Sequence, residues 1–135
     1  MTTDNPGAHL SAEVVDGTFD LARTGRVAEL TEMIGAGVPI DTRNARSDTM
    51  LIVAAYAQQA EAVAALIALG ADLNIENRMG QTAISCAVFR NDETVLQLLL
   101  NAGADPELGF HSALAIADQF QLTQMTALLL KHAAR

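Results

Sequence analysis

Apolar residues along this chain recur with helical spacing in short segments that come in pairs. The two segments of a pair are separated by about three residues that include a turn signal, so each pair predicts two antiparallel helices. A serine or threonine, both good helix N-caps, precedes the first segment of each pair; these caps are Ser11, Thr49, Thr82 and Ser112. The expected helices span residues 11–25, 27–35, 50–57, 60–68, 83–89, 93–101, 113–119 and 122–131.

The pairs themselves repeat with a fixed period. Gly70-Ala71-Asp72 and Gly103-Ala104-Asp105 lie 33 residues apart, and Thr49 and Thr82 keep the same spacing. Ser112 follows Thr82 by only 30 residues, so the last connection is shorter by 3. A period between 20 and 50 residues is typical of solenoid proteins, in which each unit buries its apolar face against the next.

The repeated unit resembles the ankyrin repeat, in which Thr-x-x-x-x-Ala opens a helix pair and Leu-Leu-x-x-Gly-Ala-Asp closes it. Thr49 and Ala54 open one pair in this sequence, and Thr82 and Ala87 open the next. The closing pattern appears in full from Leu99 to Asp105. Spacing and residue type therefore agree in successive copies, which makes the resemblance specific.

This resemblance covers about residues 17–133 and is closest to small, stand-alone bacterial ankyrin-repeat proteins. It implies an all-α fold, a solenoid of four stacked helix-turn-helix units with connecting loops, in a single domain. We expect the units at about residues 11–44, 45–77, 78–108 and 109–135.

The turn between the two helices of each unit departs from the family pattern. The expected glycine is kept only as Gly25, whereas Gln58, Asn91 and Gln121 occupy the corresponding places in the other units. If these positions need a left-handed backbone, each non-glycine residue costs roughly 1 kcal/mol, and asparagine is the most tolerant.

Composition narrows the protein class. The 135 residues are 50% hydrophobic and 18% charged, which suits one folded domain. The longest apolar runs, at 50–57 and 62–71, are far shorter than the ~20 residues that a membrane-spanning helix needs, and the first ten residues show no signal-peptide pattern. We therefore expect a cytoplasmic protein. The net charge of -8 disfavours nucleic acid and anionic membranes as partners.

Residues that could perform chemistry are few and scattered. His9, His111 and His132 lie far apart in the sequence without metal-ligand spacing, so we expect no metal site. Cys86 is the single cysteine, and its inward position on a first helix favours core packing over a reactive thiol. No serine or cysteine nucleophile has a histidine placed by a recognisable motif, so we expect neither catalytic residues nor a cofactor.

In the ankyrin family, partners are bound by the loop tips between units and by exposed positions of each first helix. The resemblance places loop tips at Asn44, Ala45, Arg46, Asp48, Asn77, Arg78, Met79 and Gln81. The expected partner-binding residues are Arg23, Arg46, Tyr56, Arg78, Met79, Phe89, Arg90 and Phe120. Aromatic side chains and arginine are the most frequent anchors of protein interfaces, so this set favours contact with an apolar and acidic feature of a partner. The alternative is that Tyr56 and Phe89 pack along the stack and that the arginines only solubilise the protein.

These observations favour a non-enzymatic protein-interaction module, an adaptor or regulator that binds its partner through the concave face of the solenoid. Because fold alone does not determine function, this expectation rests on the resemblance and on the residue types of the inner surface. The alternative is a structural protein that self-associates, and a small-ligand binder or enzyme is less favoured. We expect a monomer, with a homodimer as the alternative.

Overall fold

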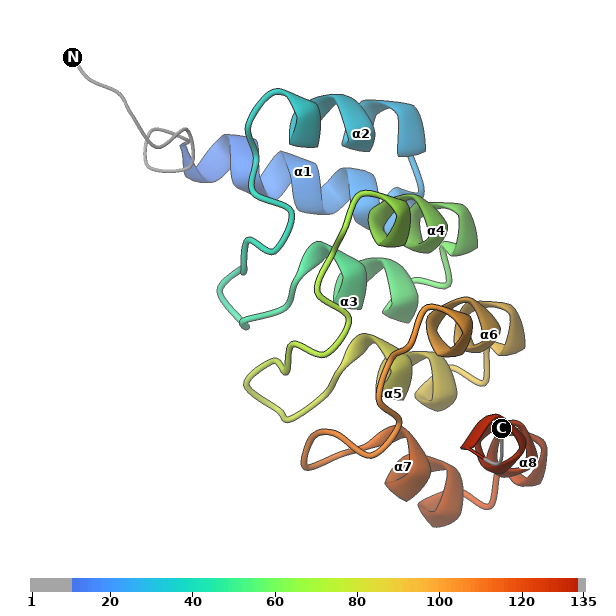
Figure 1. Cartoon of the computed structure of the whole chain (residues 1–135). Helices are drawn as coiled ribbons and strands as arrows, with labels where there is room; N and C mark the ends of the chain where they lie inside the picture. Colours follow the sequence, from blue (N-terminus) through green and yellow to red (C-terminus); the bar gives the residue numbers. More distant parts are fainter. Residues whose placement is uncertain (1–10, 134–135) are drawn as a thin grey trace.

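The computed structural model describes residues 11–133, which contain eight α-helices and no strand. The helices form four antiparallel pairs that stack in chain order, so the predicted all-α solenoid is confirmed (Figure 1). They are α1 (Ala12–Thr24), α2 (Val27–Gly35), α3 (Met50–Tyr56), α4 (Ala60–Ala68), α5 (Ala83–Phe89), α6 (Glu93–Asn101), α7 (Ala113–Gln119) and α8 (Thr123–Ala133). None of the described helices has the length and apolar character needed to span a bilayer.

The first helix of each pair begins at one of the predicted caps. The hydroxyl oxygens of Ser11, Thr49, Thr82 and Ser112 each accept a hydrogen bond from a backbone N–H three residues ahead. Thr82 also forms a capping box, because the Ser85 hydroxyl oxygen accepts from the Thr82 backbone N–H at 2.8 Å. These bonds satisfy N–H groups that have no partner within the helix, and each cap stabilises its helix by about 1 kcal/mol.

The turn between the helices of each pair has the left-handed backbone that its glycine pattern predicts. Gly25 has φ 73°, and Gln58, Asn91 and Gln121 have φ 61°, 56° and 54°. Three of the four units therefore use a residue with a side chain where glycine is the favoured residue. The backbone strain of these three residues arises at the same position in each unit, because the turn geometry repeats from one unit to the next.

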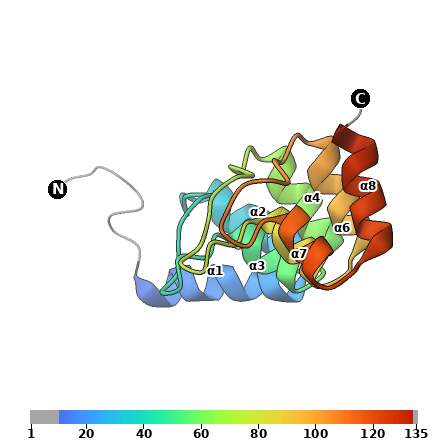
Figure 2. The same ribbon diagram turned by 90° about the horizontal axis from the view of Figure 1, so that it is seen from below.

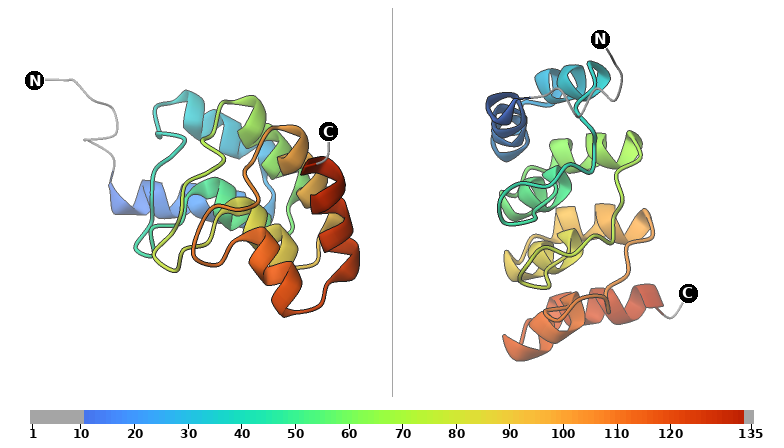
Figure 3. Two further views of the ribbon diagram at one scale, coloured as in Figure 1. Left: turned by 60° about the horizontal axis from the view of Figure 1, so that its bottom comes forward. Right: turned by 90° about the vertical axis from the view of Figure 1, so that its left-hand side faces the viewer.

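The helices form two layers. Helices α1, α3, α5 and α7 pack on one another in the inner layer, and α2, α4, α6 and α8 pack on one another in the outer layer. A view along the stack shows that successive pairs are rotated relative to one another (Figure 2). The long connecting loops between pairs all leave the stack on the same side (Figure 3).

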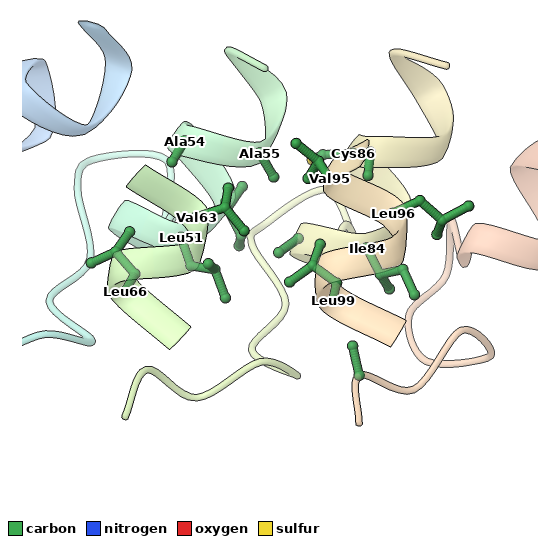
Figure 4. Close-up of a cluster of buried hydrophobic side chains, with 14 of the residues drawn as sticks. Leu51, Ala54, Ala55, Val63, Leu66, Ile84, Cys86, Val95, Leu96 and Leu99 are labelled. Carbon is green, nitrogen blue, oxygen red and sulfur yellow. The ribbon is translucent and has the colours of Figure 1, made fainter. Parts of the chain in front are cut away.

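The core is a continuous apolar layer between successive pairs. Figure 4 shows Leu51, Val63 and Leu66 from the second pair facing Ile84 and Leu99 from the third. All five are essentially inaccessible to solvent, and truncating a leucine of this kind to alanine typically costs 2–5 kcal/mol. Small side chains let the inner helices approach closely; the alanines of these helices with no exposed surface are Ala22, Ala54, Ala55, Ala87, Ala113 and Ala117.

Hydrogen bonds tie each loop to the next. The carboxylate of Asp41 accepts from the backbone N–H of Asp72 at 3.0 Å, and the Asn74 side-chain oxygen accepts from the backbone N–H of Asp105 at 3.0 Å. Both bonds join positions 31 residues apart, and the second occupies the same place one unit further along the chain. The loops are therefore held at the spacing of the helices beneath them, which fixes the positions of the residues at their tips.

Candidate functional site

A groove of about 630 Å³ runs between the inner helices of the first three pairs and the tips of the two loops that join these pairs. Its floor is mainly apolar and comes from α3 with its C-cap residue Ala57 and from α5; the helices contribute Ile52, Val53, Tyr56, Cys86 and Phe89. Arg23 at the end of α1 lies at one side. The loops supply Arg46, Asp48, Asn77, Arg78, Met79 and Gln81. Six of the eight predicted partner-binding residues therefore line one groove.

The aromatic side chains form a row across the inner helices. The rings of Tyr56 and Phe89 stack with their centroids 6.2 Å apart, and Phe89 meets Phe120 edge to face at 5.9 Å. These side chains still expose 44%, 46% and 52% of their surface. They pack along the stack, as one of the two sequence interpretations predicts, and they also remain accessible to a partner.

Arg90 packs against the Tyr56 ring of this row. Its guanidinium carbon lies 4.9 Å from the centre of the Tyr56 ring, and it donates a hydrogen bond to the side-chain oxygen of Gln58 at 3.0 Å. A guanidinium over an aromatic face is attracted by the electron-rich ring. Arg90 and Phe120 thus lie beside the groove and adjoin its lining through Tyr56 and Phe89, whereas the other six predicted residues line it directly.

A polar network holds the two loops that form the groove wall. The side-chain nitrogen of Asn77 donates to the Asp48 carboxylate at 2.8 Å and to the Gln81 side-chain oxygen at 2.9 Å. The Asn77 oxygen accepts from the backbone N–H groups of Met79 and Gln81. Asp48 and Asn77, which the resemblance places at loop tips, are both largely buried in this network. Both residues still line the groove, and their hydrogen bonds hold the loop segments that carry Arg46 and Arg78.

Cys86 lies on the groove floor and is buried, as predicted for a core cysteine. Burial raises the pKa of its thiol to about 12, and the nearby negative charge of Asp48 adds to the rise. A thiol with so high a pKa stays protonated at neutral pH and is a poor nucleophile. Across residues 11–133, no three His, Cys, Asp or Glu side chains gather in a way that could hold a metal ion. His9 lies outside the described residues.

The sequence interpretation missed Phe110, whose side chain is 84% exposed in the shortened loop before α7. The backbone N–H of His111 donates to the carbonyl of Gly80 at 3.2 Å. A Cβ on Gly80 would lie 2.7 Å from the Phe110 Cβ, so the two loops touch closely at this glycine. In the sequence, the shorter spacing and the glycines at positions 80 and 109 were the signals of this contact between loops. In the structure, both Gly80 and Gly109 have a left-handed backbone.

Comparisons with known proteins agree with this architecture. A family model described as ankyrin repeats, in three copies, matches residues 20–109. A stretch of 62 residues, 46% of this chain, is 44% identical to 9% of the mitochondrial disaggregase of Homo sapiens. A putative ankyrin repeat-containing protein of Treponema pallidum is 33% identical over 64% of this chain and 29% of its own length. A putative ankyrin repeat protein of Pseudomonas aeruginosa is 37% identical over 45% of this chain and 37% of its own length. The chain therefore spans well under half the length of these relatives.

Proposed function

Because this chain belongs to the ankyrin-repeat family, we propose that it is an adaptor or regulator that binds a protein partner in the groove of its inner surface. Ankyrin repeats are generally non-enzymatic modules that mediate protein–protein interaction. The observation that supports this site is the row of Tyr56, Phe89 and Phe120, which are half-exposed on the floor of the groove or at its edge. Exposed aromatic side chains of this kind are frequent anchors of protein interfaces.

The groove also has a composition that suits a protein segment. Polar groups at the loop tips surround an apolar floor, as the polar rim of a protein interface surrounds its apolar core. The loop network through Asp48 and Asn77 holds these groups in place before a partner arrives. A preformed surface loses less conformational entropy on binding, which favours affinity.

The test is affinity capture from the native extract followed by mass spectrometry, comparing the wild-type chain with the double variant Tyr56→Ala/Phe89→Ala. We expect the variant to lose the partners that the wild type retains. Its melting temperature should change little, because both side chains are half-exposed. The matched control is Leu69→Ala, which removes a side chain that is also 44% exposed but lies at the end of the outer helix α4.

A large fall in melting temperature of the double variant would contradict the proposal, because it would show that the aromatic row serves mainly to hold the stack together. Unchanged capture by a stably folded double variant would also contradict it. The melting experiment alone shows whether the first outcome holds, and the capture experiment shows whether the second does.

Self-association is a second candidate, supported by the outer face of α8. Leu130 is exposed on this helix, and a separate shallow hollow of about 360 Å³ is lined by Ala127 and Leu128 together with Thr123, Gln124 and Lys131. An end unit of a solenoid whose outer surface is not entirely polar can stack on a second copy. Light scattering over a range of protein concentrations tests this idea, and a concentration-independent monomer would remove it.

A further inference from the structure

Two arginines from successive loops lie side by side at the mouth of the groove. The backbone N–H of Arg78 donates to the backbone carbonyl of Arg46 at 3.3 Å. Both residues are exposed and both line the groove. Because their backbones are bonded, the two side chains leave the loops from adjacent points and bring positive charge to this part of the groove, although the chain as a whole carries a net charge of -8.

These two arginines differ from the others in what they already bind. Each of the other four arginines between residues 11 and 133 is engaged by an acceptor of the protein itself. They are Arg23 with Asp20, Arg26 with Glu29, Arg43 with the Glu76 carbonyl, and Arg90 with Gln58.

By contrast, the Arg46 side chain has only a loose ion pair, 3.7 Å from the Asp48 carboxylate. The other oxygen of that carboxylate already accepts from Asn77. The Arg78 side chain has no ion pair or hydrogen bond with any residue from 11 to 133. The hydrogen-bonding capacity of this pair is therefore left for an external acceptor.

Apolar surface adjoins the pair directly. Met79, the neighbour of Arg78 in the chain, is exposed and lines the same groove, whose floor is formed in part by Tyr56 and Phe89. A partner with carboxylates alone would leave this apolar surface in water, and an apolar partner alone would leave the two guanidinium groups without acceptors. The complementary ligand therefore combines both features.

We infer that the groove binds an acidic linear segment of a partner protein, with Asp or Glu side chains on Arg46 and Arg78 and an adjacent large apolar side chain on the Tyr56 and Phe89 floor. This inference rests on the proposed function and specifies the chemistry of the partner. The net charge of -8 disfavours acidic segments at surfaces of the chain that lack such arginines.

The test is selection from a phage-displayed library of random dodecapeptides against the full chain. Enriched peptides are expected to contain Asp or Glu within a few residues of a Phe, Leu, Met or Trp. A fluorescently labelled peptide from the selection should bind more weakly as salt rises from about 50 to 500 mM, because the interaction is between partly exposed charges.

Variants then identify the arginines that matter. Arg46→Gln and Arg78→Gln should each weaken binding of the labelled peptide by about fivefold or more. Arg26→Gln is the matched control, since it removes the same charge from a residue that pairs with Glu29 at the start of α2, outside the groove. It should leave binding nearly unchanged, and circular dichroism checks that all three variants fold.

The outcomes separate this inference from the proposed function. Enriched peptides without acidic residues, or equal binding by the wild type and the Arg46 and Arg78 variants, would overturn the acidic segment. If such peptides still needed Tyr56 and Phe89, the groove would stand as a protein-binding surface. A selection that enriches no peptide would also overturn the inference, while the capture experiment would still decide the proposed function.

Discussion

Replacing Gln121 with glycine should stabilise the protein by about 0.5–1 kcal/mol. Gln121 has φ 54°, is exposed, and occupies the turn position that Gly25 occupies in the first pair with φ 73°. A left-handed backbone costs a residue with a side chain about 1–2 kcal/mol, and glycine escapes this cost. The greater freedom of glycine in the unfolded chain takes back about 0.5–1 kcal/mol, so a net gain remains.

The assay is urea unfolding followed by far-UV circular dichroism, with Gln97→Gly as the control. Gln97 lies inside α6, where the same substitution should cost about 1 kcal/mol or more. The two variants therefore have opposite expected signs, and the Gln121 variant should melt about 2–5 °C above the wild type. If Gln121→Gly destabilised the protein as Gln97→Gly does, backbone strain at this turn would not contribute to stability.

Three further outcomes follow from the contacts around the groove. Asn77→Ala should lower the free energy of unfolding by about 2 kcal/mol, because Asp48, only 8% exposed, loses its 2.8 Å donor. If urea unfolding showed a loss of free energy smaller than that of a typical surface substitution, this expectation would be wrong. Gly80→Ala should cost about 1–2 kcal/mol in the same assay, because Gly80 has φ 75° and a Cβ at this position would meet Phe110. An unchanged urea midpoint of unfolding would contradict the close contact between the two loops. Burial raises the pKa of Cys86 to about 12 from the ordinary 9.0, so the native thiol should resist thiol reagents at about pH 8. As the pH rises above 9.0, the unfolded thiol loses its proton while the native thiol keeps it. The free energy of unfolding should therefore fall above this pH, and it should fall less in Cys86→Ala. Rapid labelling of the native protein would refute the raised pKa on which both expectations depend.

The aromatic row shows how far the sequence leads toward the site. Tyr56 and Phe89 lie one period apart, so stacking of equivalent helices places their rings next to each other, and the structure has them 6.2 Å apart. The period does not predict how much of each ring stays exposed, because exposure depends on what the neighbouring loops cover. That they are half-exposed, which leaves them accessible to a partner, is a property of the assembled stack.

The sequence by itself determined the elements of this protein, because helix caps, left-handed turns and apolar spacing are local. Thr49 begins α3 and Gln121 ends the turn after α7 through interactions with residues only a few positions away. Only the tertiary structure decided which loop residues meet. The burial of Asp48 beneath Asn77 and the contact of Arg78 with Arg46 depend on hydrogen bonds between successive loops, which form only when the helices beneath them have stacked.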